Sequence, residues 1–297
     1  MTTTATAPTL APAPPAQGVR PAGLALMLTG ALSNQLGAAA GANAFGTITP
    51  VGVVAVRQWV AGLTLLLLTR PRLRSFTWAQ WWPVLLLALV FGTMNVTLYS
   101  AVDRIGLGLA VTLEFLGPLA VALVASRRRV DLACAALAGL GVVVLLRPQP
   151  STDYVGIGLA LLAAGCWAGY ILLNRTVGRR VPGASGSAAA AVVSGTVFVP
   201  VGVLVLLHHP PTPTALALAV TAGVLASAVP MVVDLFALRR VPARFFGLFM
   251  SVHPVLAALV GLVVLGERLA WLSWLAVGAV VAANALAVLL RDRSGPA

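Results

Sequence analysis

Charge is scarce in this sequence. Only 9% of the 297 residues are Asp, Glu, Lys or Arg, and lysine is absent altogether, whereas a soluble globular domain carries about 25% charged residues. With 60% hydrophobic residues and a mean hydropathy of +0.99, the chain has too few charges to cover a water-exposed surface. This composition excludes a soluble enzyme, a nucleic-acid binder and a secreted scaffold, and it predicts an integral membrane protein.

The sequence also has little of what metal, redox or nucleotide chemistry requires. Its two cysteines, Cys134 and Cys166, lie within apolar runs, where cysteine usually behaves as a small hydrophobe. His208 and His209 form a lone pair without the acidic ligands of a metal site, and no phosphate-binding motif is present. We therefore expect no metal, no cofactor and no coupling to ATP hydrolysis within this chain.

One string has the form of a serine-protease motif. Residues 183–186 read Gly-Ala-Ser-Gly, which matches the Gly-x-Ser-Gly of intramembrane proteases, but Ser185 follows a basic loop at the membrane surface. The histidine pair at 208–209 is expected on the opposite side of the bilayer. We therefore do not expect an enzyme.

Ten long apolar segments follow a polar tail. Residues 1–21 are rich in Ala, Thr and Pro and cannot bury apolar area, so we expect a disordered cytoplasmic tail there and a second tail at 291–297. A helix needs about 20 apolar residues to span a membrane, and lipid admits only helices or closed barrels. We predict an all-α integral membrane protein with ten transmembrane helices, at 22–43, 48–69, 81–101, 106–125, 130–147, 155–177, 185–207, 214–238, 244–265 and 270–290.

The arginines predict how these helices are oriented. With a cytoplasmic N-terminus, fifteen arginines fall in cytoplasmic segments and only three, Arg104, Arg147 and Arg268, fall in external ones. Such a bias is typical of multi-pass membrane proteins, whose cytoplasmic loops are basic. Adding or removing one helix would move every later loop to the other side. The bias therefore supports an even number of helices, with both termini cytoplasmic.

An internal repeat divides the chain into two halves. The stretch from Ala101 to Ala125 aligns with the stretch from Ala237 to Gly261 at a constant offset of 136 residues. This offset shifts the chain by five helices, so the two halves enter the membrane in opposite senses. We predict two inverted five-helix repeats, at 22–147 and 155–290, with a site between them near the midplane, as in secondary transporters.

Several polar residues fall where a helix is expected to cross the membrane, and such residues are functional hypotheses by default. Arg57, Glu114 and His253 lie near the middle of their segments, and Asp234 lies about one turn from a cytoplasmic end. Glu114 suits an ammonium group or a proton, Arg57 suits a carboxylate, and His253 can titrate near neutral pH. Other side chains expected around the same polar cavity are Asn34, Gln35, Asn95, Tyr99, Trp167 and Tyr170. This set predicts a site for a small polar or zwitterionic solute, with Glu114, His253 and Asp234 as candidate proton carriers.

Each ionisable residue also has a purely structural interpretation. Arg57 and Glu114 would fit a buried pair that only fixes helix packing. His253 would fit a donor to a backbone carbonyl that Pro254 leaves open. Asp234 would fit a side chain that reaches the cytoplasmic interface. The sequence leaves these alternatives open.

Prolines and glycines predict local features of the helices. Pro118 and Pro254 align in the repeat, and each is expected to kink or loosen the middle of a helix, because proline removes a backbone hydrogen bond. Gly37–Gly41 and Gly165–Gly169 have the GxxxG spacing, which allows close approach of helices. We expect tight packing from these glycines, and a homodimer stays open.

Five short strings in the chain recur in a known family. They are Leu113–Leu123 (LEFLGPLAVAL), Ser126-Arg127-Arg128 with Val130-Asp131, Gly165–Ala168 (GCWA) with Tyr170, Phe246-Gly247 leading to Met250-Ser251, and Leu265-Gly266-Glu267. Through them, residues 22–290 resemble the EamA-type members of the drug/metabolite transporter superfamily. Gly266-Glu267 is generic to the superfamily, whereas the first string is closest to its amino-acid-exporting branch.

The resemblance implies a bacterial inner-membrane protein that exports a small amino acid, such as threonine or homoserine, by exchange for protons with alternating access. The chain departs from that pattern at two positions. The family's Met-Ser-x-Glu-Pro is here Met-Ser-Val-His-Pro, with His253 in place of the carboxylate, and Asp234 stands where a Glu is expected. The alternatives are an exporter of the same fold for another metabolite or a drug-like cation, and a non-transporting membrane partner protein.

Overall fold

The computed structural model describes residues 21–124, 136–138, 140, 153–181, 183–230, 233 and 249–291. Three expectations lie outside these residues, namely both tails, most of the helix at 130–147, and Asp234. The described elements are α1 (Pro21–Ala42), α2 (Phe45–Thr69), η1 (Leu73–Ser75), α3 (Trp78–Ile105), α4 (Leu107–Glu114), α5 (Leu116–Val124), α7 (Tyr154–Arg180), α8 (Ser185–His208), α9 (Pro213–Gly223), η2 (Val224–Ala228), α12 (His253–Val264) and α13 (Trp271–Arg291).

Four of these helices, α2, α3, α7 and α8, are long and apolar enough to cross a membrane. Their outer faces carry large apolar side chains, and Leu67, Leu89 and Leu162 are each more than half exposed. Apolar surface of this extent would not stay in water, so these faces are lipid-facing. All regular structure in the described residues is helical, and the prediction of an all-helical membrane protein is confirmed.

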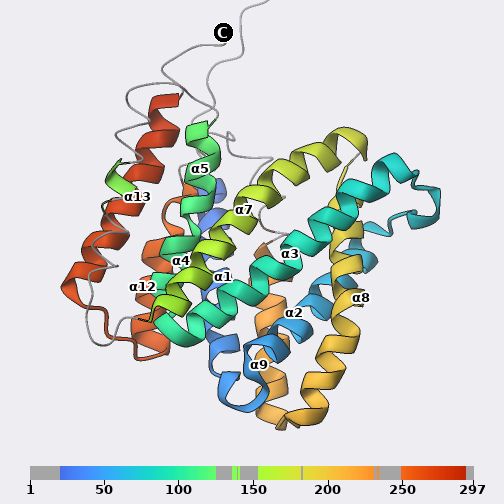
Figure 1. The fold of residues 1–297 in the computed structure, drawn as a ribbon, viewed down its shortest axis with the longest axis horizontal. Helices are drawn as coiled ribbons and strands as arrows, with labels where there is room; N and C mark the ends of the chain where they lie inside the picture. Colours follow the sequence, from blue (N-terminus) through green and yellow to red (C-terminus); the bar gives the residue numbers. More distant parts are fainter. Residues whose placement is uncertain are drawn as a thin grey trace, which may run out of the picture.

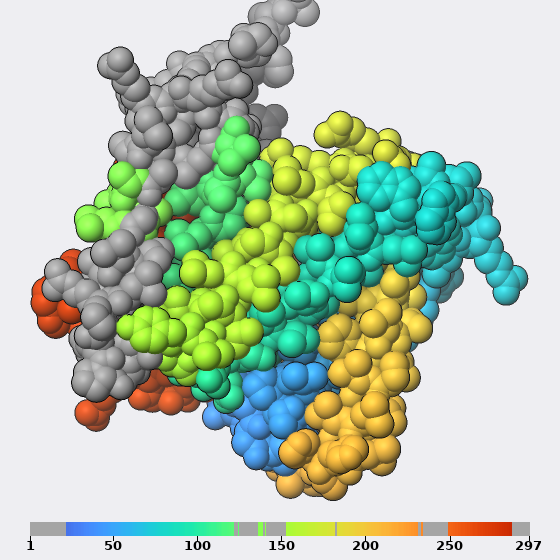
Figure 2. Space-filling model, viewed as in Figure 1, coloured from blue at the N-terminus to red at the C-terminus, as the bar shows by residue number. Residues whose placement is uncertain are grey.

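The helices pack in pairs that recur across the bundle. Figure 1 shows α3 along α7 and α2 along α8, and Figure 2 shows α3 and α7 as adjoining bands on one face. In the same way α1 packs against α9, and α12 packs against α1 as α5 packs against α7. Under the 136-residue offset α1 corresponds to α7 and α3 corresponds to α9. Each of these packings therefore has a counterpart in the other half.

The two GxxxG spacings are used differently. Gly37 lies directly on η2, since a Cβ there would come within 2.5 Å of the backbone nitrogen of Ala226. This glycine is needed for helix packing within the chain. Gly165 has nothing within 4 Å of the corresponding position, and a Cβ at Gly169 would lie 3.7 Å from Val90 of α3, so the second spacing makes no equally close contact among the described residues.

The segment expected as one helix over 106–125 is broken. α4 ends at Glu114 and α5 begins at Leu116, with a turn at Phe115 between them. The segment expected over 244–265 has a turn at Ser251 and Val252, immediately before α12. Phe115 and Ser251 are 136 residues apart, so the two breaks fall at the same place in the two repeats.

The aligned prolines follow these breaks, so the interruption expected at each proline is a complete break between two helical segments and not a kink within one helix. Pro118 is the third residue of α5 and Pro254 is the second residue of α12. Backbone N–H groups in the first turn of a helix have no partner within that helix. Proline therefore removes no helical hydrogen bond at these positions and fits the start of each half-helix.

The segment expected over 214–238 begins as α9 and continues as a π-helix, η2. π-helical turns are rare and occur often at functional sites. Ser33 of α1 donates a hydrogen bond of 2.7 Å from its hydroxyl to the carbonyl oxygen of Leu225 in this turn. The wider turn therefore offers carbonyl oxygens to the helices beside it.

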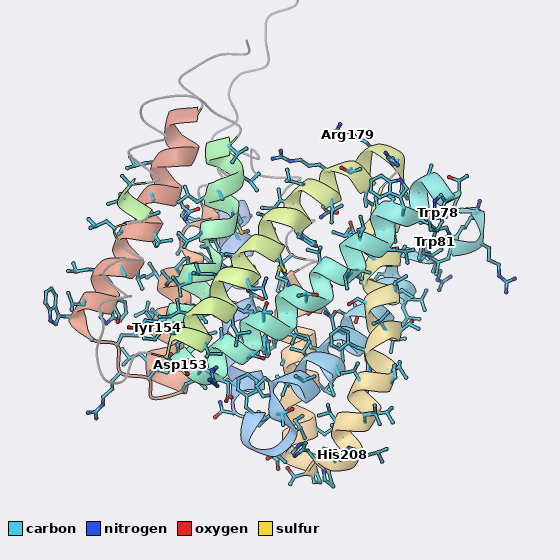
Figure 3. The ribbon with its side chains drawn as sticks, in the orientation of Figure 1. Trp78, Trp81, Asp153, Tyr154, Arg179 and His208 are labelled. Carbon is cyan, nitrogen blue, oxygen red and sulfur yellow. The ribbon has the colours of Figure 1, made fainter. Side chains whose placement is uncertain are left out.

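The first turn of α7 is joined to the last turn of α3. Asp153 caps α7 by accepting a 2.8 Å hydrogen bond from the backbone N–H of Gly156, and its carboxylate pairs with Arg104 at 3.2 Å. The hydrogen bond from Gly156, together with the positive charge of Arg104, holds the pKa of Asp153 below its usual value. Figure 3 shows Asp153 at one end of α7 and Arg179 at the other.

The opposite end of α7 is joined to the start of α3. Arg180 donates a hydrogen bond of 2.8 Å to the carbonyl oxygen of Ala79, and its own carbonyl accepts one of 2.9 Å from the Gln80 amide. The Arg180 guanidinium also lies 4.7 Å from the centre of the Trp82 ring, which is a cation–π arrangement. The two helices are therefore fastened together at both ends.

Candidate functional site

A cavity of about 240 Å³ lies among α1, α2, α3, α4 and α7 and the start of α12. All seven side chains that the sequence assigned to a binding cavity line it, namely Arg57, Asn95, Tyr99, Glu114, Trp167, Tyr170 and His253. Asn34 and Gln35 of α1 line it as well. Residues far apart in the sequence are therefore brought to one place, and only Asp234 among the expected set lies outside the described residues.

Arg57 is held by the π-helix. Its Nε donates a 3.0 Å hydrogen bond to the hydroxyl of Ser227, and its Nη2 donates a 3.1 Å bond to the carbonyl oxygen of Ala226. The guanidinium carbon lies 5.1 Å from the centre of the Tyr99 ring, within cation–π range. These contacts come from two different helices and fix the orientation of the guanidinium.

Glu114 is not the ion-pair partner of Arg57 in this structure. Within the described part of the chain, the only ion pair closer than 4.0 Å joins Arg104 to Asp153. Glu114 is the last residue of α4 and is only 6% exposed, yet it lines the cavity. The interpretation of Arg57 and Glu114 as a direct packing pair is therefore not supported.

His253 is the first residue of α12, directly after the break, and is 8% exposed. Its Nδ1 lies 3.2 Å from the amide nitrogen of Gln35, so this nitrogen is used by α1. Its ring stacks on Phe115 at a centroid distance of 5.7 Å, and Phe115 in turn meets Trp167 edge-on at 4.6 Å. The other ring nitrogen, Nε2, is buried and has no hydrogen-bond partner among the described residues.

Tyr99 is a second cavity residue with an unmatched polar atom. It is 1% exposed, and its buried hydroxyl has no partner within the residues that the structure describes. Its ring is fixed edge-on against Phe45 at 5.8 Å. A buried polar group without a partner costs about 1–3 kcal/mol. Tyr99 therefore marks a point where a ligand or a water molecule would be stabilising.

Both helix breaks face the cavity. A proline nitrogen cannot donate to the carbonyl four residues before it, so Pro118 and Pro254 cannot bond the carbonyl oxygens of Glu114 and Met250. Glu114 and Met250 both line the cavity. Backbone that departs from the regular helix is tolerated in a membrane protein where it borders such a cavity.

Glu267 of the Leu-Gly-Glu motif supports the helix that carries Glu114. Its carboxylate accepts hydrogen bonds from the backbone N–H groups of Leu107 at 2.7 Å and Gly108 at 3.5 Å. These are the first two residues of α4, and a carboxylate at a helix N-terminus is favourable. Gly106, with φ of +84°, turns the chain into this helix. The motif therefore has a structural role in this chain.

Sequence reasoning missed the partners that orient the cavity residues. Ser227 and Ala226, which bind Arg57, lie in the π-helical turn of η2, and hydropathy does not distinguish a π-helix from an α-helix. A signal was available for the break at Phe115, because Pro118 cannot donate the helical hydrogen bond to the carbonyl oxygen of Glu114.

The sequence matches a known family and curated proteins. The profile of the EamA-like transporter family matches residues 154–289. Threonine/homoserine exporter RhtA of Escherichia coli strain K12 is 37% identical over 268 residues, which cover 88% of this chain and 89% of that protein. The protein of the same name from Salmonella typhimurium strain LT2 is 37% identical over 266 residues, with 87% and 88% covered.

A solved crystal structure shares the fold. It superposes with a TM-score of 0.58 at 21% sequence identity, covering 91% of this chain and 96% of the other. At this identity the likeness concerns the fold alone, and it extends over nearly the whole chain.

Proposed function

Because this chain belongs to the EamA-like transporter family, we propose that it exports small amino acids, such as threonine and homoserine, in exchange for protons. Family membership makes it a membrane transporter and not an enzyme, as the sequence resemblance indicated. The substrate class is taken from the relatives, which are threonine/homoserine exporters. The observation that carries the proposal is the cavity, in which Arg57 and Glu114 face a shared space without pairing with each other.

Two charged side chains of opposite sign that do not pair with each other suit a zwitterion. The guanidinium of Arg57 matches the planar fork of a carboxylate, and Glu114 matches an ammonium group. The volume of about 240 Å³ is below the roughly 300–1,000 Å³ of sites for drug-sized ligands. Charge and size together favour an amino acid over a drug-like cation.

Glu114 is the proposed coupling residue. A lone charge within the membrane is costly, so this carboxylate is stable when it holds either a proton or the ammonium group of a substrate. The two then compete for one site, and a proton that enters from outside displaces the amino acid. His253 and Asp234 are the other proton candidates from the sequence, and His253→Gln and Asp234→Asn test them beside Glu114→Gln.

Alternating access between two inverted repeats is the proposed mechanism. The repeats span 22–147 and 155–290 and contain ten transmembrane helices in all. The support is the packing of α3 on α7 and of α1 on α9, together with the two breaks at equivalent positions. Half-helices that end at a central site are typical of secondary transporters.

We place both termini in the cytoplasm of a bacterial cell, with the protein in the inner membrane. Figure 3 shows Trp78, Trp81 and Arg179 toward one end of the bundle and Asp153 and His208 toward the opposite end. Arginine is enriched on the cytoplasmic side of membrane proteins, whereas tryptophan marks both interfaces. The first end is therefore assigned to the cytoplasm.

One observation favours another solute for the same fold. Where the family pattern carries a glutamate, this chain has His253, and this residue lines the cavity. The change removes one carboxylate from the wall, so a metabolite that is less cationic than the family's usual substrate is the second candidate. A non-transporting partner role has no observation in its favour.

Counterflow in proteoliposomes tests the proposal. Purified protein is reconstituted, the vesicles are loaded with unlabelled amino acid, and uptake of labelled threonine, homoserine and a panel of other metabolites is measured with and without a pH gradient. We expect saturable counterflow of threonine or homoserine that a pH gradient accelerates. Absence of counterflow for every amino acid would refute the substrate class, and flux that ignores the pH gradient would refute proton exchange.

A further inference from the structure

The contact between Gln35 and His253 determines which nitrogen of the imidazole carries a proton. The Gln35 amide nitrogen lies 3.2 Å from Nδ1 of His253. An amide nitrogen can only donate a hydrogen bond, so with the Gln35 amide oriented as in this structure Nδ1 accepts and is unprotonated. A neutral imidazole has a single N–H, which is then on Nε2. Gln35 is 1% exposed, so water does not compete for its amide.

The Nε2–H group has nothing to donate to in the described protein. It is buried and unpartnered, although the ring lines the cavity. The neighbouring rings of Phe115 and Trp167 offer no strong acceptor. The ionisable groups on the other walls of the cavity are Arg57, Tyr99, Glu114 and Tyr170, and none of them forms a recorded hydrogen bond to this nitrogen in the described chain. This nitrogen therefore has a hydrogen bond left to donate to a group that is not among the described residues.

We propose that His253 donates its Nε2–H to an oxygen on the side chain of the substrate, and that Gln35 is the positioning residue that fixes this tautomer. This inference rests on the proposed function, in which Arg57 and Glu114 bind the carboxylate and the ammonium group that every amino acid has. The hydrogen bond from His253 is then the third polar contact, and it distinguishes amino acids by their side chains. It selects amino acids that carry a side-chain hydroxyl or another oxygen acceptor, and it gives His253 a role other than proton carriage.

The ligand role is tested with two amino acids of the same shape. Threonine and valine differ by a hydroxyl in place of a methyl group, so their ratio of counterflow rates isolates that contact. We expect the wild type to prefer threonine, and His253→Phe, which keeps a stacking ring but removes the donor, to lower the preference by about ten- to a hundredfold. Valine counterflow in the same variant should persist, which shows that the variant is folded.

Gln35→Leu tests the positioning role and has a matched control. It should lower the threonine preference in the same direction as His253→Phe, because the imidazole is then free to adopt either tautomer. Gln58→Leu removes another glutamine that is 1% exposed but does not line the cavity, and it should leave the preference unchanged. An unchanged preference in His253→Phe, or an equal loss in Gln58→Leu, would overturn the proposal.

A spectroscopic measurement decides the tautomer without any substrate. The sequence has three histidines, so His208→Gln with His209→Gln leaves His253 alone to be observed by nitrogen-15 NMR of labelled histidine. We expect the neutral Nε2–H form in this background, and a mixture of tautomers once Gln35→Leu is added. A proton on Nδ1 would overturn the inference. If the wild type transports no amino acid, both the proposed function and the ligand assigned to His253 are refuted. The NMR spectrum still shows which ring nitrogen of His253 carries the proton.

Discussion

Two polar side chains of the cavity, Arg57 and His253, are oriented by uncharged neighbours. Arg57 is fixed by Ser227 and by a carbonyl oxygen of η2, and His253 is fixed by Gln35. Neutral partners hold a side chain in place without cancelling its charge or using all of its donors. The groups are therefore arranged before a substrate arrives, which reduces the entropy lost on binding.

Replacing Glu114 with glutamine should abolish transport driven by a pH gradient. Glu114→Gln keeps the shape of a buried side chain and removes both the charge and the exchangeable proton. We expect pH-driven threonine efflux to fall by at least about a hundredfold, the scale of a lost acid–base group, with normal expression and membrane insertion. Efflux from proteoliposomes under an imposed gradient measures this effect.

A double replacement separates coupling from structure. If Glu114 only balanced the charge of Arg57, then Glu114→Gln combined with Arg57→Gln would recover the transport that each single variant loses. The absence of an ion pair between the two leads us to expect no recovery. Full pH-driven transport in Glu114→Gln alone would refute the coupling role.

Removing the Ser227 hydroxyl should weaken substrate binding more than it weakens the fold. Ser227→Ala deletes the hydrogen bond to Nε of Arg57, which costs about 1 kcal/mol, and it lets the guanidinium turn. We expect KM for threonine to rise about fivefold with little change in the maximal rate. Ser33→Ala deletes a different bond to η2 and should leave KM unchanged; an equal rise there would point to a general effect on the π-helix.

At the residue level, the sequence identified the cavity side chains but not their partners. Arg57, Glu114 and His253 stand out because charge within an apolar run is rare and costly, and the cavity contains all three. Gln35 was noticed as polar, yet its hydrogen bond to His253 spans 218 positions. Pairings of that range depend on tertiary structure and leave no local pattern. The roles assigned to these residues stay predictions.

At the level of helices, the long segments were predictable, whereas their interruptions were predictable only in part. α7 and α8 begin and end within a few residues of the expected 155–177 and 185–207, because uninterrupted hydropathy marks where lipid can surround a helix. Pro118 predicted an interruption near Phe115. The π-helix η2 occurs within equally apolar sequence, and hydropathy carries no information on backbone geometry, so the π-helix was not expected.

Removing the Glu267 carboxylate should destabilise α4. Glu267→Ala deletes the acceptor for the N–H groups of Leu107 and Gly108, and the loss of such a helix cap costs about 0.5–2 kcal/mol. We expect a lower midpoint of thermal unfolding in detergent, with Glu267→Gln, which keeps an acceptor oxygen, in between. A midpoint for Glu267→Ala equal to that of the wild type would show that the cap is dispensable.

The Asp153 cap should make stability depend on acidity. Because the pKa of Asp153 is lowered in the folded state, its carboxylate stabilises the protein above the unfolded pKa, and this contribution is lost as the pH falls through the folded value. The gap in melting temperature between wild type and Asp153→Ala should therefore narrow from about pH 7 to about pH 3. The effect is expected to be small, since the pair with Arg104 is partly exposed.

Asp153→Asn provides the control for that measurement. Asparagine caps a helix about as well as aspartate but does not titrate, so the Asn variant should lose only the ion pair with Arg104. Its melting temperature relative to Asp153→Ala should not change with pH. A gap between wild type and Asp153→Ala that stays constant on acidification would contradict the assignment.

At the level of the whole molecule, thiol labelling tests the orientation. In a background with Cys134 and Cys166 replaced by serine, Thr212→Cys should react with an impermeant reagent in intact cells, whereas Ser75→Cys should not. The reason is that the basic segment around Ser75 is assigned to the cytoplasm. Both should react after permeabilisation, and reaction at Ser75→Cys alone in intact cells would reverse the topology.

The fastening of α3 to α7 at both ends constrains which parts of the molecule can move. Arg104 with Asp153 joins them at one end, and Arg180 with Ala79 and Gln80 joins them at the other. These helices come from different halves of the sequence, so they form a strut whose two members turn as one body. In the proposed alternating-access cycle, we therefore expect rigid units that are not the duplicated segments. We expect a rocking motion that divides the bundle between the strut of α3 with α7 and its counterpart of α9 with α1, so that the unit of duplication and the unit of motion differ.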